Sequence, residues 1–157
     1  MLKTCCELLE EKEIKIAFIE SASSGYLTSQ FSICKGEGAE TLLGGLVCYD
    51  VSVKVSVLGL SQDLINSYTA ESMPVTVALA QAGKKMFQDA DWVIACTGLL
   101  KPGGSATPEK PEGTFFIAID DGAQVHKLHY YLKGTPQQRL NKLVAVLAHD
   151  MINLLNQ

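Results

Sequence analysis

The sequence predicts an α/β fold in which helices cover both faces of a mixed central sheet, giving three layers. Strand-like apolar stretches alternate with stretches of helical periodicity, a pattern that favours parallel strands joined by helices. Two further strand-like stretches flank Asp121-Gly122, a dipeptide typical of an antiparallel hairpin. The chain has 157 residues, of which 47% are hydrophobic and 19% charged. We therefore expect residues 1–157 to form a single domain with its own core.

The first part of the chain predicts two helices and two strands. Leu2–Lys12 carries apolar residues at helical spacing, and Ile14–Ile19 alternates and is rich in β-branched residues, as a strand would be. After a break of small residues, Tyr26–Cys34 fits a second helix. Leu42–Tyr49 reads as a second strand, in which the glycine pair at 44–45 indicates a bulge or a close approach of another segment.

The middle of the chain contains short helices with recognisable starts. Lys54 lies on a short segment that we expect to be helical. Ser61 resembles the N-cap of a helix that continues through Asn66. Ser72 is a stronger N-cap, because Pro74 follows in the first turn, where its missing N–H costs least.

The second half predicts three more strands and a long final helix. Asp91–Thr97 is apolar enough for a central strand that is buried on both faces. A polar loop rich in Gly and Pro covers Gly98–Glu112. Thr114–Asp120 and Gln124–Leu132 form the hairpin, and Thr135-Pro136 begins an amphipathic helix.

Composition and charge exclude several classes of function. The formal net charge is −4 and the isoelectric point is near 5.3, so the chain lacks the basic face of a nucleic-acid-binding protein. No apolar run approaches the roughly 18–20 residues of a membrane span, and the acidic N-terminal segment is no signal peptide. We therefore expect a cytoplasmic protein that binds neither nucleic acid nor membrane.

Cysteine and histidine placement does not indicate a metal site. The five cysteines form no Cys-x-x-Cys pair, so we expect reduced and mostly buried thiols. His126 and His129 are three residues apart on a predicted strand and point to opposite faces. We expect no bound metal.

Three loops rich in small and polar residues each follow a predicted strand: Glu20–Gly25, Tyr49–Lys54 and Thr97–Gly104. Open α/β sheets bind ligands at the ends of their strands, so these loops are expected to share one site. A Ser in the first loop is a possible nucleophile if a base lies nearby, although a Ser-rich N-cap would look the same. Lys54 would be such a base if burial lowers its pKa, and otherwise it is a surface residue.

The third loop combines glycines with lysines, as loops that bind phosphate or ribose through backbone N–H groups do. It has neither the P-loop order of residues nor the dinucleotide pattern Gly-x-Gly-x-x-Gly. An ordinary long surface loop is the alternative.

Taken together, these segments resemble the C-terminal domain of competence/damage-inducible protein A (CinA), a family that includes nicotinamide-nucleotide amidases. The resemblance covers nearly the whole chain, with four motifs in register. They are Glu20-Ser21-Ala22-Ser23-Ser24-Gly25, Tyr49 with Lys54 five residues later, Thr97-Gly98-Leu99-Leu100-Lys101-Pro102-Gly103-Gly104, and Pro108-Glu109-Lys110-Pro111-Glu112-Gly113-Thr114.

The resemblance implies hydrolysis of the carboxamide of nicotinamide mononucleotide to nicotinate mononucleotide and ammonia, with no cofactor and no metal. It implies a small-molecule nucleotide substrate and a homo-oligomer. Ser21 would attack the amide carbon, Lys54 would act as base, and Tyr49 would hydrogen-bond within the pair. The implied substrate-binding residues are Glu20, Ser23, Ser24, Gly25, Thr97, Gly98, Pro102, Gly103, Gly104 and Lys110, with backbone N–H groups near Ser24 and Gly25 holding the oxyanion.

Several positions differ from the family pattern. Ser24 and Ala39 replace residues that are Gly and Ser in the family, and Asp50 adds a negative charge near the proposed phosphate site. Lys101 replaces a Gly and offers a cation that could pair with phosphate. The family's Arg before the last helix is missing, and Arg139 lies nearby out of register. Two alternatives therefore stand beside the amidase: a catalytically degenerate member that binds a nucleotide or a protein partner, and a Ser–Lys hydrolase acting on another amide.

Overall fold

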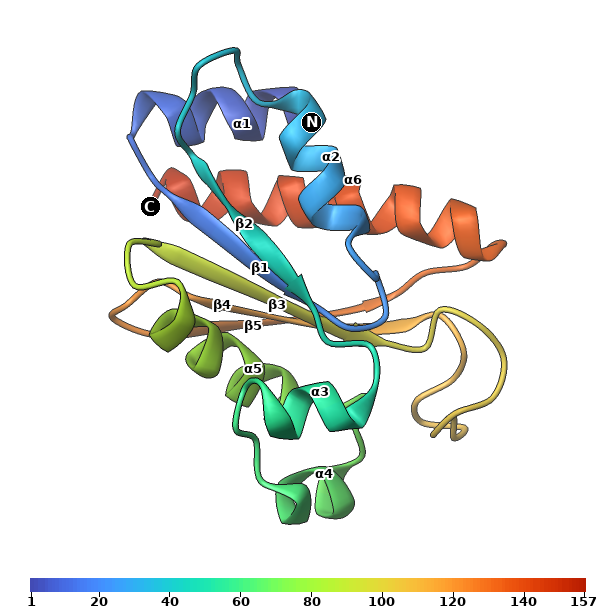
Figure 1. Cartoon of the computed structure of the whole chain (residues 1–157). Coiled ribbons are helices and arrows are strands. Elements are labelled where there is room, and N and C mark those ends of the chain that lie inside the picture. The colour runs from blue at the N-terminus through green and yellow to red at the C-terminus, as the bar shows by residue number, and fades with distance from the viewer.

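The computed structural model describes residues 1–157 and confirms the predicted α/β class, with a five-stranded mixed sheet between two layers of helices (Figure 1). Every predicted helix and strand is present, with ends that differ by at most a few residues. The elements in chain order are α1 (Leu2–Glu11), β1 (Ile16–Glu20), α2 (Tyr26–Cys34), β2 (Leu42–Val47), α3 (Val51–Ser56), α4 (Gln62–Tyr68), α5 (Met73–Met86), β3 (Trp92–Gly98), β4 (Thr114–Asp120), β5 (Val125–Tyr131) and α6 (Pro136–Leu155).

The strand order β2-β1-β3-β4-β5 determines where the site forms. Strand β1 pairs in parallel with both β2 and β3, while β4 runs antiparallel to β3 and forms a hairpin with β5. The carboxyl ends of β1, β2 and β3 therefore meet at one edge of the sheet. The three polar loops singled out in the sequence all begin at this edge.

Each face of the sheet carries its own apolar core. Helices α1, α2 and α6 cover one face and bury Phe18, Phe31 and Phe115 among others (Figure 1). Helix α5 covers the other face, with α3 and α4 farther out on the same side, and Ile19 and Val93 are buried there. All five residues of β1 are buried, because the strand is covered on both faces.

The glycine pair in β2 is associated with both a bulge and a close approach of another segment, the two possibilities that the sequence suggested. The register between β1 and β2 shifts between Ile16 and Ala17, so a bulge is present next to Gly44. A Cβ on Gly45 would lie 2.2 Å from the hydroxyl oxygen of Thr28, so α2 can approach β2 only because residue 45 has no side chain.

The predicted helix starts are confirmed by their caps. The hydroxyls of Ser61 and Ser72 accept hydrogen bonds from the backbone three residues on, and Thr135 forms a capping box with Gln138. None of the helices combines the length and the apolar character that crossing a membrane requires. The five cysteines are unpaired, and all except Cys34 are buried, as expected.

Candidate functional site

The loops after β1 and β2 bring Ser21 and Lys54 into direct contact. The Nζ atom of Lys54 lies 2.8 Å from the Oγ atom of Ser21, although the two residues are 33 positions apart in the sequence. Ser21 is the first residue after β1 and is held there by its N–H, which donates to the carbonyl of Cys96 in β3. Only 1% of Lys54 is exposed. The predicted pairing of a serine with a lysine is therefore present in the fold.

Lys54 belongs to helix α3, and the position at which this helix begins determines where Lys54 lies. Asp50 caps the helix by accepting a hydrogen bond from the N–H of Ser52 at 3.0 Å. Lys54 lies in the last turn of this short helix, and its side chain is buried against Ser21. Its Nζ also donates to the carbonyl oxygens of Cys48 at 2.5 Å and Tyr49 at 3.3 Å. Asp50 thus has a structural role in orienting Lys54.

The surroundings of Lys54 favour its neutral form. Burial lowers the pKa of Lys54 below its ordinary value of 10.5, and the weaker attractions of Cys48, Glu71 and Asp50 oppose that change. No carboxylate lies within ion-pair distance of the Nζ. A neutral amine has two N–H groups, and the carbonyls of Cys48 and Tyr49 can accept both. Its lone pair is then directed at the remaining neighbour, Ser21, which is the arrangement that a general base requires.

Ser21 lines a pocket of about 200 Å³, and Lys54 lies buried behind it. Its walls come from the loop after β1, the start of the β2–α3 connection, the segment between α4 and α5, and the loop after β3. The lining residues are Ser21, Ala22, Tyr49, Glu71, Gly98, Leu99, Leu100, Lys101, Pro102, Gly103 and Gly104.

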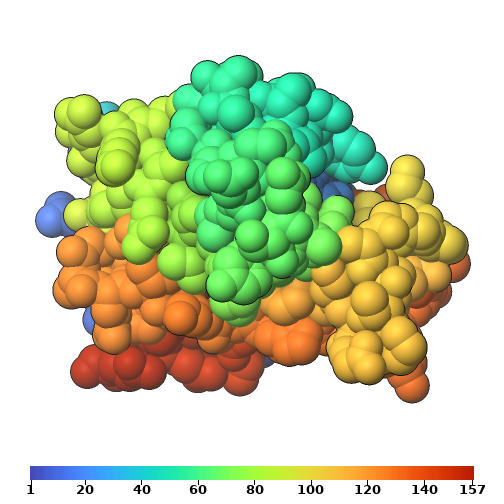
Figure 2. Space-filling model, turned by 90° about the horizontal axis from the view of Figure 1, so that it is seen from below, coloured from blue at the N-terminus to red at the C-terminus, as the bar shows by residue number.

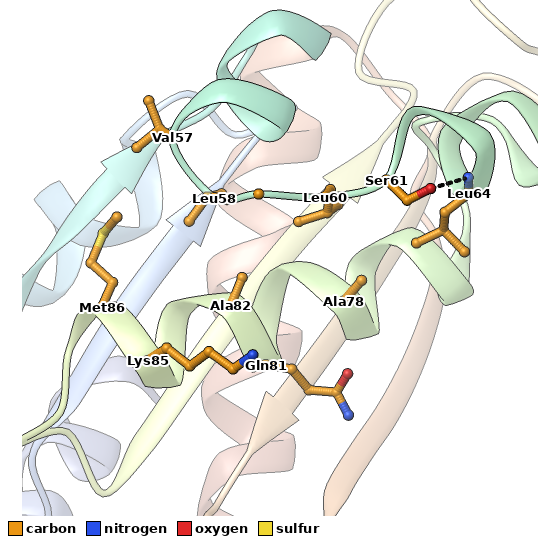
Figure 3. Close-up of a pocket in the computed structure, with 11 residues that line it drawn as sticks. Val57, Leu58, Leu60, Ser61, Leu64, Ala78, Gln81, Ala82, Lys85 and Met86 are labelled. Carbon is orange, nitrogen blue, oxygen red and sulfur yellow. Dashed lines mark hydrogen bonds between the residues drawn. The ribbon is translucent and has the colours of Figure 1, made fainter.

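A larger hollow of about 490 Å³ lies elsewhere, between the Val57–Ser61 loop and α5 (Figure 3). Its lining is mainly apolar, and the hydroxyl of Ser61 there accepts the N–H of Leu64 at 3.3 Å as a helix cap. No base contacts that hydroxyl, so the smaller pocket at Ser21 is the candidate site.

Several predicted binding residues line the Ser21 pocket together. Gly98 and residues 102–104 line it together with Ser21 and Tyr49. The backbone carbonyl of Tyr49 accepts from Lys54, and Tyr49, which is 60% exposed, also lines the pocket. Ala22, the residue after Ser21, also lines the pocket, and its N–H donates to no other atom of the chain, so it is available to stabilise an oxyanion. The N–H of Ser24, which was expected near the oxyanion, instead donates to the carbonyl of Ser21 at 3.1 Å.

Other predicted binding residues lie behind this lining. The carboxylate of Glu20 is buried and accepts hydrogen bonds from the N–H groups of Leu27 and Thr28 at 2.8 and 2.9 Å, and from the Thr28 hydroxyl at 2.5 Å. It therefore caps α2. Thr97 is also buried, and its hydroxyl bonds that of Thr76 at 2.8 Å.

The end of the first loop has a turn geometry that suits small residues. Ser24 and Gly25 have φ values of 50° and 91°, in the left-handed region that glycine adopts most easily. Ser24 is exposed, whereas Ser23 is buried and its Oγ has no hydrogen-bond partner. These three residues shape the turn that presents Ser21, and they do not line the pocket.

Lys110 holds two loops together. Its Nζ donates to the hydroxyl of Thr69 at 2.7 Å, the carbonyl of Glu71 at 2.7 Å and the hydroxyl of Ser105 at 2.8 Å. The loop after β3, gold in Figure 2, consequently lies against the green segment between α4 and α5. Because its three donors are engaged within the chain, Lys110 positions the pocket wall.

Arg139 secures the same loop from α6. Its guanidinium donates to the carbonyls of Leu100 at 2.8 Å and Leu132 at 3.1 Å, and it pairs with Glu112. Arg139 thus supports the pocket wall, although it is out of register with the arginine of the family pattern.

Two charged residues of the pocket, Glu71 and Lys101, lie outside the set of predicted binding residues. Glu71 immediately precedes the N-cap Ser72, in a segment without a motif, so no local signal identified it. Lys101 departs from the family pattern, and its cation was expected only to be capable of pairing with phosphate. Both line the pocket that contains Ser21.

Comparisons with known proteins agree with this architecture. The family model described as the CinA C-terminal domain matches residues 1–155. A CinA-like protein from Prochlorococcus marinus is 36% identical over 149 residues, covering 94% of this chain and 34% of the relative. A CinA-like protein from Fervidobacterium nodosum is 30% identical over 146 residues, covering 93% of this chain and 35% of the relative. The chain thus spans about a third of the length of these relatives.

Solved structures show the same fold. A CinA superfamily protein from Enterobacter cloacae superposes with a TM-score of 0.86 at 24% identity, covering 98% of this chain and 90% of that one. A CinA superfamily protein from Klebsiella pneumoniae gives a TM-score of 0.88 at 19% identity, covering 99% of this chain and 96% of that one.

Proposed function

The chain belongs to the CinA C-terminal domain family, and from this premise and the geometry of its site we propose that it is an amidase acting on nicotinamide mononucleotide. The observation that carries the proposal is the 2.8 Å contact between the Ser21 hydroxyl and the buried amine of Lys54. A serine needs a neighbouring base to become a nucleophile, and a lysine with a lowered pKa is such a base.

The first half of the reaction transfers the acyl group to Ser21. The neutral amine of Lys54 takes the hydroxyl proton while Oγ attacks the carboxamide carbon, and the N–H of Ala22 stabilises the negative oxygen that develops. As the tetrahedral intermediate collapses, the carbon–nitrogen bond breaks. Lys54 returns its proton to the leaving nitrogen, which departs as ammonia and leaves an ester on Ser21.

The second half repeats the same proton movements with water. Lys54 takes a proton from a water molecule as the water oxygen attacks the ester carbon. The carbon–Oγ bond then breaks, Ser21 recovers its proton from Lys54, and nicotinate mononucleotide is released. The residues of the pair therefore end each cycle as they began.

Ammonia release from nicotinamide mononucleotide tests the proposal. The wild-type protein is expected to release ammonia, and the Ser21→Ala and Lys54→Met variants to lose at least about a thousandfold in kcat, as loss of a nucleophile or its base does in related mechanisms. Lys127→Met is the matched control, because Lys127 is exposed on β5, away from the pocket.

The alternatives give different results in the same samples. If the wild-type protein releases no ammonia between pH 6 and 10 while the nucleotide still raises its melting temperature, the protein binds a nucleotide without turning it over. Full activity in Lys54→Met would remove Lys54 from the mechanism. Release of ammonia from other amides but not from this nucleotide would favour a Ser–Lys hydrolase with a different substrate.

A further inference from the structure

The Ser21 pocket carries opposite charges on two different segments. Glu71 comes from the connection between α4 and α5, and Lys101 comes from the loop after β3. No ion pair joins these two side chains or connects either of them to another residue. An unpaired carboxylate and an unpaired ammonium in one pocket are available to a ligand that carries both charges.

We propose that Glu71 and Lys101 are specificity-determining residues, and that they select a nucleotide with a cationic ring and an anionic phosphate. This inference rests on the proposed function, because it concerns the same pocket. Glu71 contacts the ring end and Lys101 the phosphate end of the substrate.

The carboxylate of Glu71 is held in place by the loop network. The Ser105 hydroxyl donates to its Oε2 atom at 2.6 Å, and the same hydroxyl accepts from Lys110, which also donates to the backbone carbonyl of Glu71. The Oε1 atom of Glu71 has no donor within the chain. The network therefore orients the carboxylate and leaves one oxygen free for a ligand.

The residues on both sides of Lys101 are restrained. The carbonyl of Leu100 accepts from Arg139 at 2.8 Å, and Pro102 restricts the backbone on the other side. Lys101 itself is exposed, and its ammonium makes no hydrogen bond within the chain. The backbone of Lys101 is thus anchored while its side chain is free to reach a phosphate at the mouth of the pocket.

The chemistry of the substrate matches this arrangement. The nicotinamide ring of the oxidised mononucleotide is a pyridinium, with a formal positive charge on the ring nitrogen, and the phosphate is anionic. Glu71 therefore attracts the ring of the substrate. Hydrolysis converts the neutral carboxamide into a carboxylate, which Glu71 disfavours, so the same residue also promotes release of the product.

Three ligands that differ in which charge they carry distinguish the effect of Glu71 from that of Lys101. Nicotinamide mononucleotide carries both, its reduced form keeps the phosphate but has a neutral ring, and nicotinamide riboside keeps the cationic ring but lacks the phosphate. We would measure kcat/KM for ammonia release from each with wild type, Glu71→Gln and Lys101→Met. Glu109→Gln is the control, because it makes the same charge change as Glu71→Gln at an exposed position of the loop that carries Lys101, outside the lining of the pocket.

Each variant is expected to lose activity on two ligands and keep it on the third. Glu71→Gln should lower kcat/KM about tenfold for the two cationic-ring ligands, which corresponds to about 1.4 kcal/mol, and leave the reduced nucleotide within about twofold of wild type. Lys101→Met should lower it about tenfold for the two phosphate-bearing ligands and spare the riboside. An equal loss on all three ligands in Glu71→Gln would overturn the charge assignment and indicate a hydrogen bond to the ribose hydroxyls.

Binding measurements keep this test independent of turnover. In a Ser21→Ala background, dissociation constants of the three ligands should follow the same pattern for both charge variants. If the wild type releases no ammonia but this binding pattern appears, the proposed function fails and the charge assignment stands. Binding that is unaffected by both substitutions, or absent for every ligand, would overturn the charge assignment.

Discussion

Replacing Glu20 by Gln tests whether this residue supports the fold or binds the substrate. The resemblance to the family places Glu20 among the binding residues, whereas the structure directs its carboxylate into the start of α2. We expect Glu20→Gln to melt at a clearly lower temperature than wild type and to bind nicotinamide mononucleotide normally while folded.

The size of the effect follows from the hydrogen bonds of the carboxylate. Glu20 accepts three, two from backbone N–H groups of the first turn of α2 and one from the Thr28 hydroxyl, and only 1% of the residue is exposed. Gln keeps one oxygen, and its amide group then faces a buried donor. A hydrogen bond to a charged group is worth about 1.5–3 kcal/mol, and loss of negative charge at a helix N-terminus adds up to about 1 kcal/mol. We therefore expect a loss of about 3–4 kcal/mol in unfolding free energy.

The assay combines thermal unfolding with ligand binding. For a chain of this length, 1 kcal/mol shifts the melting temperature by about 2–4 °C, so the expected decrease is about 10 °C. Glu37→Gln, which changes an exposed carboxylate in the loop after α2, should melt within about 1 °C of wild type. Isothermal titration with nicotinamide mononucleotide, in a Ser21→Ala background and well below the transition, supplies the binding constant without turnover.

The opposite pattern would refute this reasoning. If Glu20→Gln melted with the wild type but bound the nucleotide at least tenfold more weakly, Glu20 would be a substrate ligand and α2 would not depend on it. A decrease in both quantities would show that the cap and the pocket are coupled through the loop that presents Ser21.

Two further predictions concern the amine and the pocket wall. Since burial lowers the pKa of Lys54 below 10.5, kcat/KM should rise with pH as the amine loses its proton, with the midpoint of the rise below pH 10.5. A rise centred at or above 10.5 would contradict the role of Lys54 as base. Arg139→Met should raise KM several-fold with little change in kcat and lower stability by about 2–3 kcal/mol, because the carbonyl of Leu100 and the carboxylate of Glu112 lose their partner. Steady-state kinetics and thermal unfolding measure both effects, and an unchanged KM would show that Arg139 does not support the pocket.

The secondary structure could be predicted from the sequence because its signals are local. Ser61, Ser72 and Thr135 each bond the backbone three residues away, and Asp121-Gly122 makes the turn between two strands that are adjacent in the chain. The pairing of Ser21 with Lys54 was also predictable, because both follow strands whose carboxyl ends meet at one edge of a parallel sheet.

The roles of individual polar residues could not be assigned in the same way. Glu20 and Lys110 belong to recognisable motifs, but the atoms that they bond were not evident from those motifs. Glu20 accepts from residues in the first turn of α2, seven and eight positions away. The partners of Lys110 include Thr69 and Glu71, about forty positions away. Glu71 has no motif at all and enters the pocket only because the loop after β3 folds against the segment that carries it.

The sequence by itself determined the class of fold, the order of the elements and the pairing of Ser21 with Lys54. Caps and turns act over short distances, and the pairing follows from the direction of the parallel strands. Only the tertiary structure decided which charged groups line the pocket and which form hydrogen bonds within the chain. A buried polar group must be paired, and its partner is whichever segment the packing of the whole chain brings within hydrogen-bond distance. The same rule leaves Glu20 and Lys110 engaged and Glu71 and Lys101 without an ion pair.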